Sequence, residues 1–342
     1  MASLRDVAKD TGFSTSTVSR VINNREGVDP ETKKKILAAI DRLAYKPNLV
    51  AQGLRVRRGN LIGLVVPQST VHVFSLIIRH ALEAAWQRGY DIVVVNSNED
   101  PNQEEERIND LLRRNINGII FSRVSDESRI LPKIMGNIPT VIVDRAFEQE
   151  KVASIVLDNR RAGYLAGQHL VALGHEHIAC VTGPLKIALC RERLDGFREA
   201  LGDAGLVLPE DAIFEGDFKF APGEWVSERL VEPGSRFSAL WAMNDLMAFR
   251  ALRALINAGR SIPGEVSLAG MDDTEYCEMV SPTLTSIHYP FQQLAERAVE
   301  ILLMQIDTNH IGNETIVLQP GITVRESTGR VAQCTPVNLE GV

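Results

Sequence analysis

Cysteine is scarce in this sequence, and long apolar runs are missing from it. The 342 residues include four cysteines that lie far apart and form no C-x-x-C pair. We therefore expect neither disulfides nor bound zinc. No apolar run approaches the roughly 20 residues that a membrane span needs, and the first residues lead into a charged segment instead of an apolar signal peptide. The sequence thus predicts a cytoplasmic protein without a membrane partner.

The motifs of nucleotide-binding proteins and hydrolases are missing as well. Neither half of the chain has a G-x-G-x-x-G turn after its first strand, a G-x-x-x-x-G-K-[ST] loop or a G-x-S-x-G elbow. We expect no enzyme activity, no cofactor and no metal. His175 and His177 could suggest a metal site, but a structural role at a turn into a strand is favoured because no third ligand is near in sequence.

Positive charge is in deficit overall but not at the amino-terminal end. The chain carries 37 Lys and Arg against 44 Asp and Glu, a net charge of −7. Residues 1–59 hold 12 Lys and Arg against 6 Asp and Glu, a net of +6, which leaves 25 against 38, a net of −13, for residues 60–342. A small basic head on a large acidic body suits a protein that presents one end to the phosphates of DNA.

Three short helices are predicted in the basic head. Ser3 followed by Asp6 resembles a capping box, and Ser14 can cap a second helix. Asp29 and Pro30 begin a third helix. The expected apolar stripe of the third helix consists of Ile36, Leu37, Ile40 and Leu43. These signals predict a three-helix core with a helix-turn-helix at residues 4–23.

One face of the second helix is free to read DNA. Val18, Val21 and Ile22 recur at helical spacing and should face the small core. The opposite face is polar and able to donate hydrogen bonds, as a helix in the major groove requires. The predicted DNA contacts of this helix are Thr15, Ser16, Thr17, Ser19, Arg20 and Asn23. An amphipathic surface helix without a DNA partner is the alternative.

The head resembles the lactose-repressor/galactose-repressor (LacI/GalR) family of transcriptional regulators. The resemblance rests on the strings Leu4-Arg5-Asp6-Val7-Ala8 and Ser14 to Asn23, and on Tyr45 to Arg55, which matches the family's hinge. In that family two hinges become helical when they pair on operator DNA, and a hinge leucine wedges into the central base step. The implied hinge contacts are Asn48, Ala51 and Leu54. A linker leucine packed on the body is the alternative role of Leu54.

The sequence of the body, from residue 60 onward, predicts alternating short strands and helices. Its expected strands are Leu61–Val66, Ile92–Val95, Gly118–Phe121, Val141–Val143, Ile178–Val181, Ala239–Ala242 and Val266–Ala269. Helices between them, such as Leu76–Trp86 and Gln103–Arg113, supply crossovers between parallel strands. The sequence therefore predicts an α/β body of two doubly wound lobes, with polar loops at the carboxyl ends of the strands facing a ligand crevice.

The family resemblance covers residues 3–328 and implies a body similar to periplasmic sugar-binding proteins. Matching body motifs are Gly183-Pro184-Leu185, Arg193-Leu194-Asp195-Gly196-Phe197, Asn244-Asp245, Gly270-Met271-Asp272-Asp273 and Pro282-Thr283-Leu284-Thr285. The implied division is a DNA-binding domain at 1–46, a hinge and linker at 47–59, an effector-binding domain at 60–330 and a disordered tail at 331–342. One lobe should comprise about 60–157 plus 291–319, and the other 158–290 plus 320–330.

The implied effector contacts have the chemistry of a polyol site. They are Phe74, Ser122, Asp144, Arg193, Phe218, Asn244 and Asp272. Arginine, asparagine and aspartate can bind paired hydroxyls, and aromatic rings offer apolar faces to a sugar. Structural roles are the alternative for the acidic residues: Asp245 could cap a helix, and Asp144 a turn.

The effector itself stays open between a neutral sugar and a sugar acid or phosphate. The segment Lys186 to Glu192 is largely apolar where relatives often carry polar contacts, so an apolar side of the effector is expected. Arg123 and Arg145 follow two strand ends, which makes an anionic effector conceivable.

A single DNA-reading helix contacts too few bases for useful discrimination, so we expect a homodimer on a palindromic operator. The tail contains Pro336 and lacks an apolar heptad, which disfavours tetramers. Effector binding should rotate the lobes and change the spacing of the hinges. The expected function is that of a repressor, with inducer or corepressor control and activation at some promoters left open.

Two other functions are compatible with the body alone. One is a solute-binding protein of a transporter, and the other is an enzyme that uses Asp144 and Asp272 as an acid and base pair. The head counts against the first, and the absence of a nucleophile or cofactor motif counts against the second.

Overall fold

The fold comes from a computed structural model that describes residues 3–22, 27–43, 45, 60–69, 72–123, 130–134, 136–145, 152–218 and 237–331. The chain divides into two compact units, residues 1–59 and 60–342. Among the described residues, none of the helices combines the length and apolar character needed to cross a membrane.

The described residues of the first unit form three helices, α1 (Leu4–Thr11), α2 (Thr15–Ile22) and α3 (Pro30–Arg42). The capping box of α1 is present: the Ser3 side chain accepts from the Asp6 amide, and the Asp6 side chain accepts from the Ser3 amide. Asp29 caps α3 through the amides of Glu31 and Thr32. These contacts satisfy amides at the helix starts that have no partner within the helix.

The small core of this unit is made of buried side chains from all three helices. They are Val7, Ala8, Val18, Val21, Ile36 and Ala39. The predicted stripe of α3 was wrong at Leu37, which is 44% exposed. Leu37 follows Ile36 directly and therefore projects about 100° away around the helix, whereas Ala39 at i+3 returns to the core face.

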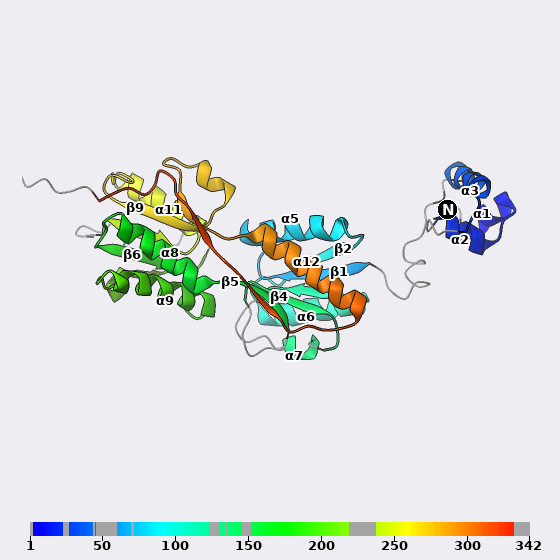
Figure 1. The fold of residues 1–342 in the computed structure, drawn as a ribbon, viewed down its shortest axis with the longest axis horizontal. Helices are drawn as coiled ribbons and strands as arrows, with labels where there is room; N and C mark the ends of the chain where they lie inside the picture. Colours follow the sequence, from blue (N-terminus) through cyan, green and yellow to red (C-terminus); the bar gives the residue numbers. More distant parts are fainter. Residues whose placement is uncertain are drawn as a thin grey trace, which may run out of the picture. The chain divides into compact units, whose positions relative to one another are not determined.

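The second unit contains two six-stranded sheets, each flanked by helices (Figure 1). The first sheet has the order β11-β5-β4-β3-β1-β2. Its strands are β1 (Leu61–Val66), β2 (Asp91–Asn96), β3 (Ile119–Phe121), β4 (Thr140–Val143), β5 (Ala153–Leu157) and β11 (Thr315–Leu318). Its helices are α5 (His72–Trp86), α6 (Pro101–Arg113), α7 (Leu131–Ile134) and α12 (Phe291–Thr308).

The second sheet has the order β12-β10-β9-β8-β6-β7. Its strands are β6 (Ile178–Thr182), β7 (Ile213–Glu215), β8 (Ala239–Ala242), β9 (Ser267–Asp272), β10 (Thr285–His288) and β12 (Gly321–Thr323). Among the described residues, it is accompanied by the helices α8 (Asn159–Ala172), α9 (Ala188–Asp203) and α11 (Asp245–Asn257) and by the short 3-10 turns η1 (Glu210–Ala212) and η2 (Glu275–Glu278).

All ladders in the two sheets are parallel except the pairing of β10 with β12, which is antiparallel. The predicted fold class of two doubly wound lobes is confirmed. The prediction of parallel strands alone missed β12, a three-residue edge strand, because nothing in so short a segment specifies its direction.

The chain passes between the two sheets three times. The passages follow β5 at Leu157, β10 at His288 and β11 at Leu318. Because strands from distant parts of the sequence meet here, the carboxyl ends of the central strands and the three crossing segments lie in one region of the second unit (Figure 1).

Candidate functional site

The first candidate surface is the outer face of α2. Ser14 begins the helix, since its Oγ accepts from the Thr17 amide at 3.1 Å. Thr15, Ser16 and Arg20 are exposed. Thr17 and Ser19 are half-buried. Val18 and Val21 fill the opposite face, so the polar face is open to a partner.

Four predicted DNA contacts cannot be placed on this surface. Asn23, Asn48, Ala51 and Leu54 lie outside the described residues. Their roles stay predictions.

The second candidate site begins with Arg193 and Asp272 in the second lobe. Arg193 lies on α9 and is only 4% exposed. Its Nε donates to Asn159 Oδ1 at 2.8 Å, and its Nη1 donates to the Met243 carbonyl at 3.1 Å. The guanidinium is therefore held by the start of α8 and by the residue after β8.

Asp272 ends β9 and is buried. Burial raises the pKa of Asp272 well above its usual value, and the neighbouring carboxyl of Asp245 raises it further, while Arg193 acts in the opposite direction. Its φ of 116° is in the region that a non-glycine residue rarely adopts. Such strain concentrates at functional sites, where the surroundings hold it in place.

Asp245 is a structural residue, but it is not the helix cap. The cap of α11 is Asn244, whose Oδ1 accepts from the Met247 amide at 2.8 Å. One carboxyl oxygen of Asp245 accepts from the amide and hydroxyl of Thr274 at 2.9 and 3.0 Å, and the other accepts from Ser286 Oγ at 2.6 Å. Asp245 thus holds the loop after β9 against β10.

Asn244 also fixes the backbone beside it. Its Nδ2 donates to the Phe218 carbonyl at 3.1 Å, so both ends of its amide are engaged. The Phe218 ring lies directly over Gly183, where a Cβ would come within 2.0 Å of the ring. A glycine is therefore required at position 183 to keep this ring in place.

The first lobe contributes Asp144, Ser122 and Phe74. Asp144 follows β4 with a φ of 68°, and its Oδ1 accepts from the hydroxyl of Tyr289 at 3.2 Å. Burial and the nearby Asp144 raise the pKa of Tyr289, which keeps that hydroxyl protonated as a donor. Ser122 is fully buried, and its Oγ has no hydrogen-bond partner in the described structure.

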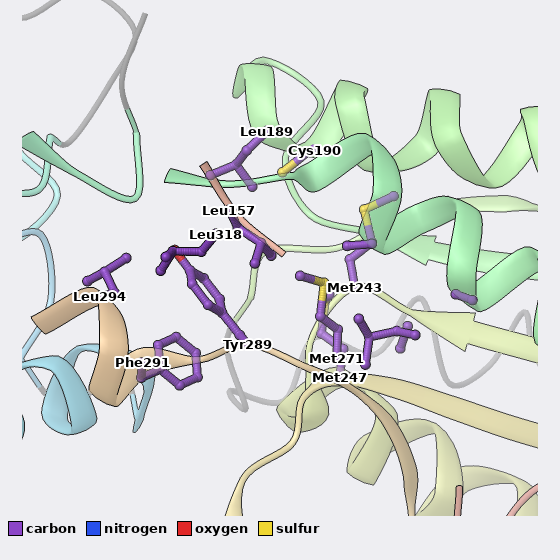
Figure 2. Packing of buried hydrophobic residues seen from close by; sticks show 14 of the residues in the cluster. Leu157, Leu189, Cys190, Met243, Met247, Met271, Tyr289, Phe291, Leu294 and Leu318 are labelled. Atoms are coloured by element: carbon purple, nitrogen blue, oxygen red, sulfur yellow. The ribbon is translucent and has the colours of Figure 1, made fainter. Parts of the chain in front are cut away.

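Tyr289 connects these lobes although the sequence analysis did not single it out. It follows β10 at a crossing segment and is only 2% exposed. Figure 2 shows its ring between Phe291 and Leu294 on one side and the methionines Met243, Met247 and Met271 on the other. Only its position at a strand end next to a proline could have drawn attention to it.

A cavity of about 440 Å³ opens beside Asp144. Its polar lining includes Asp144, Arg145, Asp158, Asn159, Arg160 and Glu192. Its apolar lining includes Val156, Leu157, Ile187, Leu189 and Val317. The apolar departure that the sequence shows before Arg193 therefore faces this cavity.

The predicted contacts do not all line that cavity. Asp144 does, whereas Asn244 and Asp272 line a much smaller cavity of about 10 Å³ with His72, at the start of α5. Phe74 is buried one turn into α5. Asn159 and Glu192 line the larger cavity and were not predicted, because neither belongs to a recognisable motif.

The two arginines behind the anionic hypothesis contact each other, and Arg123 is buried. Arg145 Nη1 donates to the Arg123 carbonyl at 3.2 Å, and its Nε lies 3.7 Å from Asp144 Oδ2. His175 is buried with its ring nitrogens 2.9 Å from the hydroxyls of Ser238 and Ser267, which is the structural role favoured for it.

Comparisons with known proteins agree on the architecture. A family model for bacterial regulatory proteins of the lacI family matches residues 3–48, and one for a periplasmic binding protein-like domain matches residues 167–328. The transcriptional repressor PurR of Mannheimia succiniciproducens is 34% identical over 97% of this chain and 100% of its own length. The PurR repressor of Vibrio parahaemolyticus is 32% identical over the same shares.

Solved structures of similar proteins cover both units. The Lac repressor dimer, bound to operator and the anti-inducer ONPF, has a TM-score of 0.87 at 30% identity and covers 96% of this chain and 99% of its own. The transcriptional regulator CelR in complex with cellobiose has a TM-score of 0.72 at 29% identity, with 96% and 100% covered. With the helix-turn-helix and the two-lobed body, these matches show that the chain belongs to the lacI family of bacterial regulatory proteins and is a DNA-binding transcriptional repressor.

Proposed function

We propose that this repressor binds a palindromic operator as a homodimer and that a small, hydroxyl-rich molecule held between the lobes controls its affinity for DNA. The observation that carries the proposal is the convergence of Arg193, Asp272 and Asp144, three buried ionisable groups from two lobes, with Arg193 and Asp144 both close enough to act on the pKa of Asp272. Asp144 also lines the cavity of about 440 Å³. Burying ionisable groups is expensive, so a cluster of them drawn from two lobes indicates ligand recognition.

The lining favours a neutral effector over an anion. The cavity presents three carboxylates, Asp144, Asp158 and Glu192, against the two guanidinium groups of Arg145 and Arg160. Ile187 and Leu189 add an apolar wall. A sugar with one apolar face fits both features, and related regulators have been solved with cellobiose and with D-xylulofuranose. A sugar acid or sugar phosphate is the second candidate, which the positions of Arg123 and Arg145 suggest.

The proposed DNA contacts are the exposed face of α2 and the hinge. Thr15 and Ser16 would meet base edges, Thr17, Ser19 and Arg20 would meet bases or phosphates, and Asn23, Asn48, Ala51 and Leu54 would complete the interface. We further propose residues 1–46 as the DNA-binding domain, 47–59 as hinge and linker, and 60–330 as the effector domain. A chain that acts on DNA in this way is a non-catalytic protein of the cytoplasm.

A dimer also explains exposed apolar side chains on the body. Leu82 and Trp86, one turn apart on α5, are 42% and 72% exposed. Tyr276 and Met279 lie at η2, and the ring of Tyr276 contacts His72 at the start of α5. Large apolar side chains that stay exposed on a folded chain are typical of an interface.

The effector is tested by melting the full chain in the presence of a panel of neutral sugars, sugar acids and sugar phosphates. A compound that binds only the folded state, present at a concentration of 100 times its Kd, raises the free energy of unfolding by about 2.7 kcal/mol. We expect at least one neutral sugar to raise the melting temperature. Stabilisation by acids or phosphates alone would replace the neutral effector with the anionic one, and no stabilisation by any compound would contradict the proposal.

A further inference from the structure

Two consecutive residues at the end of β9 have left-handed backbone conformations. The φ angles are 116° at Asp272 and 57° at Asp273. The Asp273 amide donates to Ser286 Oγ at 3.1 Å, and Ser286 in turn donates to Asp245. Each such conformation costs about 1–3 kcal/mol and persists only when surrounding contacts impose it. The contacts of Asp273 therefore help to determine where Asp272 lies.

The carboxylate of Asp273 binds residues from two other strands. Its Oδ2 lies 3.0 Å from His288 Nδ1 and accepts from Thr323 Oγ1 at 2.7 Å. Its Oδ1 forms an ion pair with Arg325 Nη1 at 2.8 Å. Burial alone would raise the pKa of Asp273, but these partners lower it to about 2. The group is therefore a carboxylate at every pH at which the protein is expected to work.

These partners are located where the chain passes between the lobes. His288 is the last residue of β10, and the chain enters the first lobe immediately after it through Tyr289 and Pro290. Thr323 is the last residue of β12, the strand formed as the chain returns. One side chain thus ties two of the three crossing segments to the loop that carries Asp272.

The connection continues into the first lobe. Tyr289, next to His288, donates to Asp144 at 3.2 Å, and its amide faces the Asp272 carbonyl at 3.5 Å. The two carboxylates proposed as effector contacts in opposite lobes, Asp272 and Asp144, are therefore joined through Asp273, His288 and Tyr289 by consecutive bonds. Such a series of contacts couples the two lobes only if breaking one contact in one lobe changes the structure or dynamics of the other lobe.

We infer that Asp273 is a positioning residue that couples the effector-binding loop of the second lobe to the crossing segments, and through Tyr289 to Asp144 in the first lobe. The inference rests on the proposed function in that it takes Asp272 and Asp144 as effector contacts. The coupling itself is a property of the chain without any ligand. It can therefore be tested before the effector is known.

The test is amide hydrogen exchange on the full-length protein without ligand, comparing wild type with Asp273→Asn. Asparagine keeps the shape and tolerates a positive φ, so the substitution removes the charge while sparing the backbone. We expect exchange to rise about tenfold in 286–291 and in 318–323, and also in 140–145 of the other lobe.

Two further variants separate coupling from local stability. Glu278→Gln removes the charge of the second carboxylate that pairs with Arg325, a largely exposed group 3.5 Å from its Nη2, and the amides of this variant should exchange at wild-type rates. Thr323→Val removes one bond to Asp273 and should raise exchange in 318–323 and 140–145 even if Asp273→Asn fails to fold.

The outcomes are distinct. A rise confined to 270–276 would make Asp273 a local support of one turn and overturn the inference, as would a profile identical to wild type. Because no ligand or DNA is present, neither result bears on the proposed function, which the sugar panel tests separately.

Discussion

The carboxyl group of Asp272 is buried next to a second carboxyl group, that of Asp245. Burial and like charge both favour the protonated form, so folding raises the pKa of Asp272. The folded state then binds more protons than the unfolded chain at any pH between the ordinary value of 3.8 and the raised one. The contribution of Asp272 to stability is therefore present below pH 3.8 and is lost as the pH rises through the folded-state pKa.

Asp272→Asn is expected to stabilise the protein and to abolish effector binding. The amide does not ionise, so it removes the cost of burying a group that is ionised in the unfolded chain at neutral pH. The free energy of unfolding should rise there by about 1 kcal/mol or more, which is roughly 2–4 °C in melting temperature. The variant should show no shift with a sugar that stabilises wild type. Asp195→Asn, an exposed position on α9, serves as the control and should behave like wild type in both measurements. A destabilised Asp272→Asn that still responds to the sugar would contradict this account.

At the scale of elements, the packing of α8 on α9 sets the position of Arg193. A Cβ on Gly163 would lie 1.8 Å from the Arg193 carbonyl, and one on Gly196 would lie 1.8 Å from the Arg160 carbonyl. The two helices therefore touch backbone to backbone. Since Arg193 bonds Asn159 across this contact, the contact holds a guanidinium of the crevice in place.

Gly163→Ala should force the helices apart and cost about 1–3 kcal/mol in unfolding free energy. Effector affinity should fall as well, because Arg193 moves with α9. Gly202→Ala on α9, the helix that packs against α8, is the control: no atom lies within 4 Å of its Cβ, so it should be neutral or stabilising by up to about 1 kcal/mol. Denaturant unfolding of both variants measures the difference, and equal stabilities would refute the backbone contact.

The elements that sequence predicts best are those with a strong local signal. β1 and β8 coincide with the expected ranges because both are continuous apolar runs in the middle of a sheet. β11 was not expected: it is a four-residue edge strand whose side chains alternate in exposure, so it lacks the continuous buried run of a central strand. The site is harder to predict from sequence than the strands are. Arg193 and Asp272 are 79 positions apart, and only the family resemblance connected them. Tyr289 and Asp273 act through tertiary contacts, which no local pattern reports.

At the scale of the whole molecule, dimer formation decides whether two α2 helices can occupy an operator together. Leu82→Arg should place a charge in the proposed interface on α5 and produce a monomer in sedimentation equilibrium, with operator affinity reduced about 100-fold or more. Val207→Arg alters another exposed apolar residue, 82% exposed after α9, and should remain dimeric. If Leu82→Arg also remains dimeric, the interface lies elsewhere.

The central claim is that DNA binding by α2 is controlled from the crevice between the lobes. The most direct test has two steps. Binding sites are first selected from random double-stranded DNA with the wild-type protein, and the affinity of the protein for the selected DNA is then measured by titration with and without the stabilising sugar. We predict a palindrome with half-sites about 10 base pairs apart, or a multiple of this, and an affinity that the sugar changes at least tenfold in wild type but not in Asp272→Asn. A sequence without two-fold symmetry, or an affinity that the sugar leaves unchanged, would contradict the account.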